Sequence, residues 1–464
     1  MTLIRSISGI RGTIGGKPGE GLSPIDTVKY TAAFCSFIQE SRQKANPRFV
    51  VGRDARLSGR IINNLVCATL QAMGADVTDI GLTTTPTAEM AVTALSSDAG
   101  IILTASHNPE NWNALKLLNH KGEFISAAEG ARVLEKAEKE DYRFAEVMHL
   151  GKYSVNDQML DYHIARILEL PLVNSEAIRR AGFRVAVDAV NSTGGIAIPA
   201  LLKALGVEEV ICINCEPDGL FAHNPEPLPK HLTVISETVR NQKADLGIVV
   251  DPDVDRLALI CEDGGMFGEE YTLVAVADYI LQNTGGNTVS NLSSTQALKI
   301  ITQKAGFEYH AAAVGEVNVV EMMKQNEAVI GGEGNGGVIY PALHYGRDAL
   351  VGVALFLSHL AEKGLTASEL RATYPDFTIS KNKIELDPGT NTEKILNAIH
   401  QQHQHLPCHT TDGLKIDFGA EWVHLRQSNT EPIIRIYAEA KSPERADEMA
   451  VAIMEAIKKV VAGQ

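Results

Sequence analysis

Three aspartates stand at alternate positions directly after an apolar run, in the segment 251–255 with the sequence DPDVD. If the backbone here is extended, alternate side chains point to the same side, so the three carboxylates would lie close together. Such carboxylates repel one another unless a cation neutralises them, and hard oxygen ligands suit Mg²⁺. The segment therefore predicts a magnesium site at Asp251, Asp253 and Asp255, and the adjacent Arg256 could hold a phosphate oxygen.

Three alternatives to a magnesium site stay open for this acidic segment. A calcium loop of the EF-hand kind would use Glu262 at its twelfth position, but Arg256 stands where its sixth position needs glycine. The aspartyl nucleophile of haloacid-dehalogenase-like phosphatases also follows an apolar strand, although a third aspartate and a mid-chain position fit it poorly. A solvated acidic loop is the remaining alternative.

Ser106 follows another apolar run, in the segment 104–109 with the sequence TASHNP. A serine before Asn-Pro is often only a turn residue. Next to a bound metal, however, a serine hydroxyl can accept and return a phosphoryl group. Lys116, further along the chain, is a candidate proton carrier if it is not simply a surface lysine. His107 adjoins Ser106 in sequence, which does not establish a serine–histidine couple.

Two further loops could bind a ligand. The segment 331–337, GGEGNGG, is too rich in glycine for a buried strand, and Glu333 within it can accept bonds from vicinal hydroxyls. A flexible loop is the alternative. The segment 426–435, RQSNTEPIIR, has two arginines and two hydroxyls around a turn, which together can grip a dianion.

A threefold internal repeat would position these loops. The segments 48–109, 183–256 and 287–337 each read as strand, helix, strand, helix and an apolar strand that ends in a polar loop. Continuous apolar strands between helices indicate α/β domains, in which ligand loops follow the carboxyl ends of strands. We expect three related mixed α/β domains (1–150, 151–256 and 257–370) and a smaller C-terminal α+β domain (371–464).

Composition narrows the class of protein. The chain has 464 residues and a formal net charge of −15, which argues against binding to nucleic acid or to anionic membranes. It has no apolar run near the ~20 residues that span a bilayer and no secretory signal, so we expect a cytoplasmic protein. Six cysteines in so long a chain do not form a disulfide framework, and Cys212 and Cys215 are expected to be buried strand residues.

Together the four loops resemble the α-D-phosphohexomutase family of phosphoglucomutases, phosphomannomutases and phosphoglucosamine mutases. The resemblance spans essentially the whole chain and implies four domains around a central cleft. It also implies one Mg²⁺ per active site, a sugar 1,6-bisphosphate as activator, a small phosphosugar as the binding partner, and a monomer or homodimer. The implied reaction passes through a phosphoserine and a bisphosphorylated sugar.

The resemblance assigns roles residue by residue. Ser106 is the phosphorylated serine and, with Asp251, Asp253 and Asp255, a metal ligand. The remaining candidates are catalytic (Lys116 and Arg11, the latter in the motif SGIRG at 8–12), substrate-binding (Arg256, Glu333, Asn335) and phosphate-binding (Arg426, Ser428, Asn429, Thr430, Arg435).

The sugar-binding loop departs from the family pattern. Asn335 stands where the family usually has serine, and neither Gly337 nor the segment 314–317 has the histidine of some phosphomannomutases. The loop is more similar to that of phosphoglucosamine mutases, which predicts interconversion of glucosamine 6-phosphate and glucosamine 1-phosphate. A phosphoglucomutase/phosphomannomutase of broad range is the alternative; a metal-dependent sugar phosphatase and a non-catalytic sugar-phosphate binder are less favoured.

Overall fold

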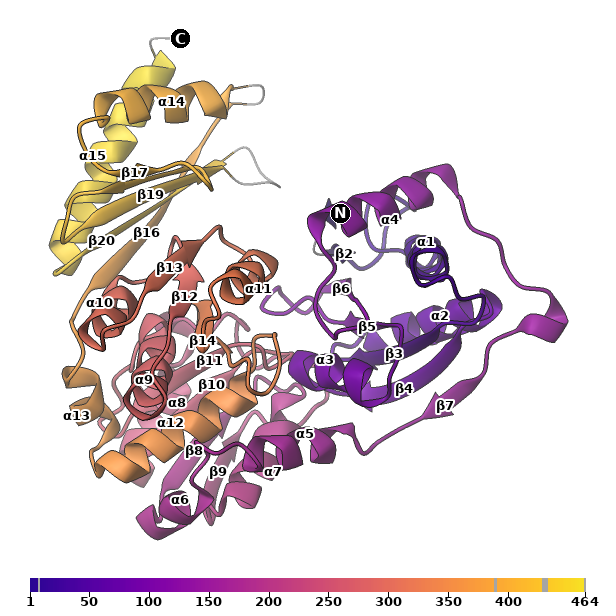
Figure 1. Ribbon diagram of the computed structural model, residues 1–464, viewed down its shortest axis with the longest axis horizontal. Coiled ribbons are helices and arrows are strands. Elements are labelled where there is room, and N and C mark those ends of the chain that lie inside the picture. The colour runs from indigo at the N-terminus through magenta and orange to yellow at the C-terminus, as the bar shows by residue number, and fades with distance from the viewer. Residues whose placement is uncertain (7–8, 388–389, 428–432, 463–464) are drawn as a thin grey trace. The chain divides into compact units, whose positions relative to one another are not determined.

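The structure is a computed structural model that describes residues 1–6, 9–387, 390–427 and 433–462 (Figure 1). It divides into two compact units. The first unit comprises Met1–Asn283 and Asn335–Arg371, and the second comprises Thr284–Gly334 and Ala372–Gln464. Each unit is described by itself.

The first sheet of the first unit has the strand order β1-β2-β6-β5-β3-β4-β7. Its strands are β1 (Leu3–Ser6), β2 (Gly9–Thr13), β3 (Arg48–Arg53), β4 (Asp76–Leu82), β5 (Ala99–Leu103), β6 (Trp112–Leu118) and β7 (Tyr153–Val155). Its helical elements are α1 (Pro24–Arg42), α2 (Gly59–Ala72), α3 (Thr85–Ala94), α4 (Ala127–Lys139) and η1 (Val147–His149). The core under α1 includes Phe34, Phe37 and Phe49, all almost fully buried.

The second sheet of this unit has the order β11-β10-β8-β9. Its strands are β8 (Arg184–Asp188), β9 (Glu209–Ile213), β10 (Leu246–Val250) and β11 (Leu257–Cys261). The other elements of the unit are α5 (Met159–Leu168), α6 (Ser175–Ala181), α7 (Gly194–Leu205), η2 (Pro229–His231), α8 (Thr233–Gln242), α9 (Glu269–Asn283), β15 (Gly337–Ile339), α12 (Ala349–Lys363) and α13 (Ala367–Ala372).

The second unit contains a parallel sheet and an antiparallel sheet. In the parallel sheet, β12 (Thr288–Asn291) pairs with both β13 (Tyr309–Ala312) and β14 (Ile330–Glu333), and its helices are α10 (Ala297–Lys304) and α11 (Glu316–Gln325). The antiparallel sheet has the order β16-β20-β19-β18-β17. Its elements are β16 (Thr378–Glu385), α14 (Thr392–Gln402), β17 (Cys408–His409), β18 (Leu414–Asp417), β19 (Trp422–Gln427), β20 (Ile433–Ala440) and α15 (Pro443–Ala462).

The predicted threefold repeat is confirmed by the strand order. In each repeat the first strand lies between the third and the second, in the orders β5-β3-β4, β10-β8-β9 and β14-β12-β13, and these neighbours are parallel. The third strands β5, β10 and β14 are buried along their whole length, as the apolar runs of β5 and β10 predict. The predicted class, related α/β domains followed by an α+β domain, is therefore correct. The expectation that the segment 331–337 is too rich in glycine for a buried strand is wrong for Gly331, Gly332 and Glu333, which belong to β14.

Two further expectations concern membrane-spanning segments and the burial of Cys212 and Cys215. Among the described residues, no helix has both the length and the apolar character that a membrane crossing requires. The expectation that Cys212 and Cys215 are buried is wrong: Cys212 is exposed and Cys215 is half-buried. The two residues belong to or follow β9, which lies at the edge of its sheet, so the apolar run around them does not indicate full burial.

Candidate active site

Ser106 lies in the loop that follows β5 and contacts the acidic loop that follows β10. Its Oγ donates a hydrogen bond to Asp251 Oδ2 at 2.7 Å across 145 residues of chain. The residue is buried, and its backbone has a φ of 48°, in the left-handed region. For a residue with a Cβ this conformation costs about 1–2 kcal/mol, and such strain persists only where the surrounding contacts impose it.

Arg56, whose side chain is almost fully buried, makes contacts that hold this loop. Its Nη2 donates to the carbonyl oxygens of Ser106 and Asn108, the latter at 2.7 Å. Its Nε pairs with Asp54 at 3.0 Å, and Asp54 also accepts a hydrogen bond from Thr104 Oγ1 at 2.6 Å. This role of Arg56 could not be predicted from the sequence, because nothing local distinguishes a buried arginine from an exposed one.

The acidic loop is a turn and not the extended segment that the sequence analysis expected. Val254 N donates to Asp251 O at 3.1 Å, and Val254 has a φ of 63°. The turn brings one carboxylate oxygen from each of Asp251, Asp253 and Asp255 to within 4.8 Å of the others, and all three side chains are buried. The predicted convergence is therefore observed, but chain reversal produces it instead of strand pleating.

Buried cations stabilise this concentration of negative charge. Lys116 Nζ lies 2.7 Å from Asp253 Oδ2 and 3.5 Å from Asp255 Oδ2, and Arg347 Nη2 lies 2.6 Å from the same Asp255 oxygen. Burial alone would raise the pKa of Asp255, but Arg347, Lys116 and Arg256 outweigh it and lower the pKa. Burial and the two neighbouring aspartates raise the pKa of Asp251 well above its usual value.

The proton of Lys116 is held by the same charges. Burial would lower the pKa of this ammonium group, but Asp253 and Asp255 outweigh it and raise the pKa. These contacts favour the protonated form of Lys116, which can donate a proton. His107 has the opposite character, since burial and Arg256 lower its pKa to about 2 and leave it a neutral, very weak base.

The acidic loop fits a hard divalent cation. Asp253 Oδ1 is buried and accepts no hydrogen bond from any part of the chain that the structure describes. A buried carboxylate oxygen without a donor is costly, and a metal ion would remove that cost. Three carboxylates with the Ser106 hydroxyl beside them form an all-oxygen donor set, which suits Mg²⁺.

Thr85 is a further contact that the sequence analysis missed. This residue begins α3, and both its backbone N–H and its hydroxyl donate to Asp253, the former to the carbonyl oxygen at 2.8 Å. Arg347, which precedes the helix N-cap Asp348, was missed as well. A threonine-rich or Gly-Arg-Asp helix start is a weak signal in sequence, because only the fold shows which loop it faces.

Arg11, Arg256 and Asn335 also belong to the first unit. Arg11 Nη1 donates to Asn108 Oδ1 at 3.4 Å, and the Arg256 amide donates to Asp251 Oδ1 at 3.2 Å. Asn335 Oδ1 accepts the Gly337 amide at 3.2 Å. Between them Gly336 has a φ of 85°, and a Cβ there would lie 2.3 Å from the carbonyl oxygen of Leu257, so this position requires glycine.

Glu333 lies in the second unit, at the end of β14. It is buried, and its Oε1 accepts hydrogen bonds from Asn291 Nδ2 at 2.9 Å and from the Gly315 amide at 3.1 Å. The carboxylate is thus held by the last residue of β12 and by the loop that follows β13. Its orientation is set by the same strand-end relationship that the repeat predicted.

Part of the predicted phosphate-binding loop lies outside the described residues, namely Ser428, Asn429 and Thr430. Arg426 is described and pairs with Asp412 at 2.7 Å. Arg435 lies directly opposite Arg426 on the neighbouring strand, and Lys383 lies opposite Arg435 on the next. Lys383 also lies 3.3 Å from Glu385 Oε1. Like charges at opposed positions repel, so a row of three cationic side chains could accommodate an anion.

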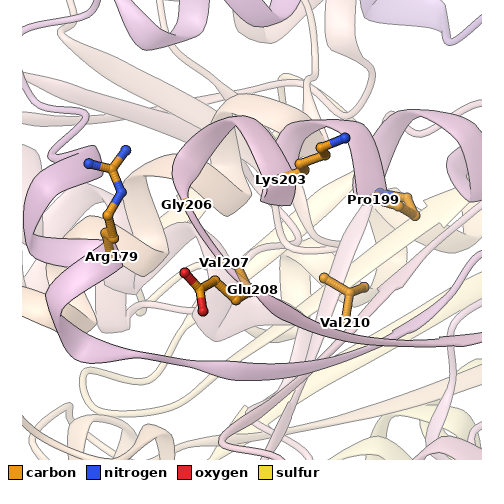
Figure 2. Close-up of a pocket in the computed structure, with 7 residues that line it drawn as sticks. All are labelled: Arg179, Pro199, Lys203, Gly206, Val207, Glu208 and Val210. Carbon is orange, nitrogen blue, oxygen red and sulfur yellow. The ribbon is translucent and has the colours of Figure 1, made fainter.

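One surface pocket of the first unit involves none of these residues (Figure 2). It has a volume of about 580 Å³ and lies between α6, α7 and β9. Arg179 and Lys203 are its basic lining residues. Neither Ser106 nor any residue of the acidic loop lines this pocket.

Comparisons with known proteins identify the family of the chain. Four successive matches are to phosphoglucomutase/phosphomannomutase α/β/α domains I (3–144), II (161–265) and III (268–377) and to the C-terminal domain (382–456). A phosphoglucomutase/phosphomannomutase of Thermococcus kodakarensis is 35% identical, with 94% of this chain and 96% of the relative covered. A probable phosphoglucosamine mutase of Methanopyrus kandleri is 32% identical, with 98% and 97% covered.

The fold agrees with a solved structure as well. A phosphoglucomutase/phosphomannomutase family protein of Burkholderia thailandensis superposes with a TM-score of 0.84 at 25% identity, over 98% of this chain and 97% of that one. The repeated α/β/α domains and the strand-end loops thus define an isomerase that acts on phosphosugars. The chain belongs to the α-D-phosphohexomutase family.

Proposed function

We propose that this phosphohexomutase interconverts glucosamine 6-phosphate and glucosamine 1-phosphate by way of a phosphorylated Ser106. The observation that carries the proposal is the 2.7 Å hydrogen bond from Ser106 Oγ to Asp251 Oδ2 in a buried, strained loop. A serine held there can pass its phosphoryl group to a sugar hydroxyl and receive another from the resulting bisphosphate.

Each surrounding residue has a proposed task. Arg56 and Thr104 hold the serine loop, and Lys116, which carries a proton at neutral pH, serves as the general acid. Arg11 and Arg256 contact phosphate oxygens. Asp251, Asp253 and Asp255 would hold Mg²⁺, which when bound supplies positive charge to offset that of the transferring phosphoryl group.

Further residues are proposed to recognise the sugar and its other phosphate. Glu333 and Asn335 would accept and donate hydrogen bonds to sugar hydroxyls. Arg426 and Arg435, with Lys383 beside them, would hold the phosphate that is not being transferred. Because one phosphate site serves both isomers, the bisphosphate must turn over between the two transfers, and free sugar 1,6-bisphosphate would restore a dephosphorylated serine.

The glucosamine substrate is supported by the sugar loop and by one relative. Neither Gly337 nor the segment 314–317 provides histidine, as in the phosphoglucosamine-mutase pattern, and the Methanopyrus kandleri relative is named a probable phosphoglucosamine mutase. The Thermococcus kodakarensis relative, named phosphoglucomutase/phosphomannomutase, supports a broad-range mutase as the second candidate.

Intact-mass analysis tests the phosphoserine. After incubation with glucose 1,6-bisphosphate and Mg²⁺, the chain should gain one phosphoryl group. Ser106→Ala should gain none and should lose mutase turnover, whereas Ser41→Ala, a change at an exposed helical serine, should match the unchanged protein. Phosphorylation of Ser106→Ala, or release of inorganic phosphate in place of isomer, would contradict a mutase acting through Ser106.

Comparison of kcat/KM tests the substrate. Glucosamine, glucose and mannose 1-phosphates should be measured in parallel with the same activator. We expect the highest value for glucosamine 1-phosphate. A preference for mannose 1-phosphate greater than about tenfold, equivalent to about 1.4 kcal/mol of transition-state binding, would instead establish the broad-range candidate.

A further inference from the structure

A second cluster of metal-ligating side chains lies in the first unit and is separate from the aspartate triad. It consists of His163 on α5, His344 in the loop before α12, and Asp348, the N-cap of α12. One ligand atom from each residue lies within 4.8 Å of the other two. His163 and Asp348 are fully buried, and the His344 side chain is 13% exposed.

Two of the three separations between the ligand atoms are close to those of a tetrahedral site. Asp348 Oδ2 lies 2.9 Å from His163 Nε2 and 3.2 Å from His344 Nε2. Ligands on a tetrahedral zinc ion with bonds of about 2.0 Å lie about 3.3 Å apart, so small adjustments would admit the ion. Asp348 Oδ1 is already used, since it accepts the amides of Leu350 and Val351 at 2.8 and 3.3 Å.

Both histidines have an oxygen partner at the ring nitrogen that faces away from Asp348. His163 Nδ1 lies 2.9 Å from Thr87 Oγ1, and His344 Nδ1 lies 3.4 Å from Glu89 Oε2. Thr87 and Glu89 both belong to α3. Outer partners of this kind orient the rings, and where they accept the Nδ1 proton they direct the Nε2 lone pair at a metal.

The cluster gathers carboxylate groups where little water reaches them. Asp348 and Glu89 are almost fully buried, and the His344 ring lies between them, 3.2 Å from Asp348 Oδ2 and 3.4 Å from Glu89 Oε2. A divalent cation at His344 Nε2 would offset this concentration of negative charge.

We propose that His163, His344 and Asp348 bind one divalent transition-metal ion of the Zn²⁺ class, with Thr87 and Glu89 as outer partners. Two imidazoles and one carboxylate suit zinc, whereas the all-oxygen triad suits Mg²⁺. The ion would join α3, α5 and α12, and α5 packs against both other helices (Figure 1). Thr85 and Arg347 contact the aspartate triad and belong to these joined segments. The ion would therefore stabilise the segments that position the triad.

Metal content after refolding tests this proposal independently of activity. The full chain is unfolded with a chelator, refolded with Zn²⁺ or Co²⁺, freed of excess metal and analysed for metal per chain. All proteins carry Cys212→Ser and Cys215→Ser, because the exposed Cys212 and the half-buried Cys215 could themselves bind zinc. A matched control adds Asp251→Asn and Asp253→Asn, which alter the Mg²⁺ site only.

The chain that carries only the two cysteine substitutions and the control with Asp251→Asn and Asp253→Asn should each retain one Zn²⁺ per chain. With Co²⁺ in place of Zn²⁺, both should show the visible absorption of a tetrahedral nitrogen–oxygen site. His163→Gln and His344→Gln should each lose that equivalent, with folding checked by circular dichroism. Absence of Zn²⁺ from the chain with the intact cluster would overturn the proposal whatever the variants do. Full retention by a folded His344→Gln would overturn it as well.

Discussion

Arg347 Nη2 lies 2.6 Å from Asp255 Oδ2, and this pair is largely shielded from water. A buried carboxylate left without its cation is strongly destabilising, by about 3–5 kcal/mol where no other partner is present. Here Lys116 and Arg256 also act on Asp255. The pair therefore links the start of α12 to the acidic loop without being the loop's sole source of positive charge.

Arg347→Met should lower the free energy of unfolding at pH 7 by about 3 kcal/mol. This value is at the low end of the range given above because Lys116 and Arg256 still act on Asp255. The pKa of Asp255 is depressed in the folded protein, so its stabilising contribution exists above the unfolded pKa and is lost as the pH falls below about 4. Urea unfolding at pH 7 and at acid pH should show the difference between variant and parent shrinking. A difference independent of pH would argue against a charge effect.

Lys116→Arg and Lys116→Met separate charge from proton transfer. Arginine keeps the positive charge beside Asp253 and Asp255 but does not release a proton in proteins. Lys116→Arg should therefore keep a thermal midpoint close to that of the parent while kcat falls about 10²–10⁴-fold. Lys116→Met, which also lacks the positive charge, should lower both the thermal midpoint and kcat. A kcat of Lys116→Arg within tenfold of the parent would remove Lys116 from the proton-transfer role.

Asp253→Asn tests the metal site. The variant removes one negative charge from the triad, so the Mg²⁺ concentration for half-maximal activity should rise by at least about tenfold. Chelation should abolish turnover of the parent, and added Mg²⁺ should restore it. Asp263→Asn, at an exposed turn, is the matched control and should leave the Mg²⁺ dependence unchanged.

Glu439 provides a pH-dependent test of the second unit. Its two carboxylate oxygens each lie 3.1 Å from the Gln296 amide, and burial raises its pKa to about 7. A raised acid pKa stabilises the fold below the unfolded pKa of about 4.3, and that stability is lost as the pH rises toward 7.

The stability of the parent relative to Glu439→Gln should thus fall by about 3 kcal/mol between pH 4.5 and pH 7. The neutral amide of glutamine imitates the protonated acid, so differencing the two proteins cancels the titration of all other groups. Thermal unfolding of both across this range checks the prediction. Parallel stability curves would mean that Glu439 titrates at its ordinary pKa.

The repeat was predictable because its signals are local. Apolar strands, glycine-terminated helices and polar strand-end loops can each be recognised within a few residues, and their recurrence indicates equivalent positions in three sheets. Ser106 and the triad were found in this way. The extended geometry expected for the acidic loop was wrong, because the φ of Val254 is not a property that its residue type suggests.

Residue types, their order and their recurrence were sufficient to establish the α/β repeats, the acidic loop and the family resemblance, since these depend on short-range patterns. Packing alone decided which distant groups meet: Arg56 under Ser106, Thr85 and Arg347 at the triad, and two histidines at Asp348. Such contacts join segments far apart along the chain, and a buried charge is satisfied by whichever partner the fold brings near. No local pattern specifies that partner.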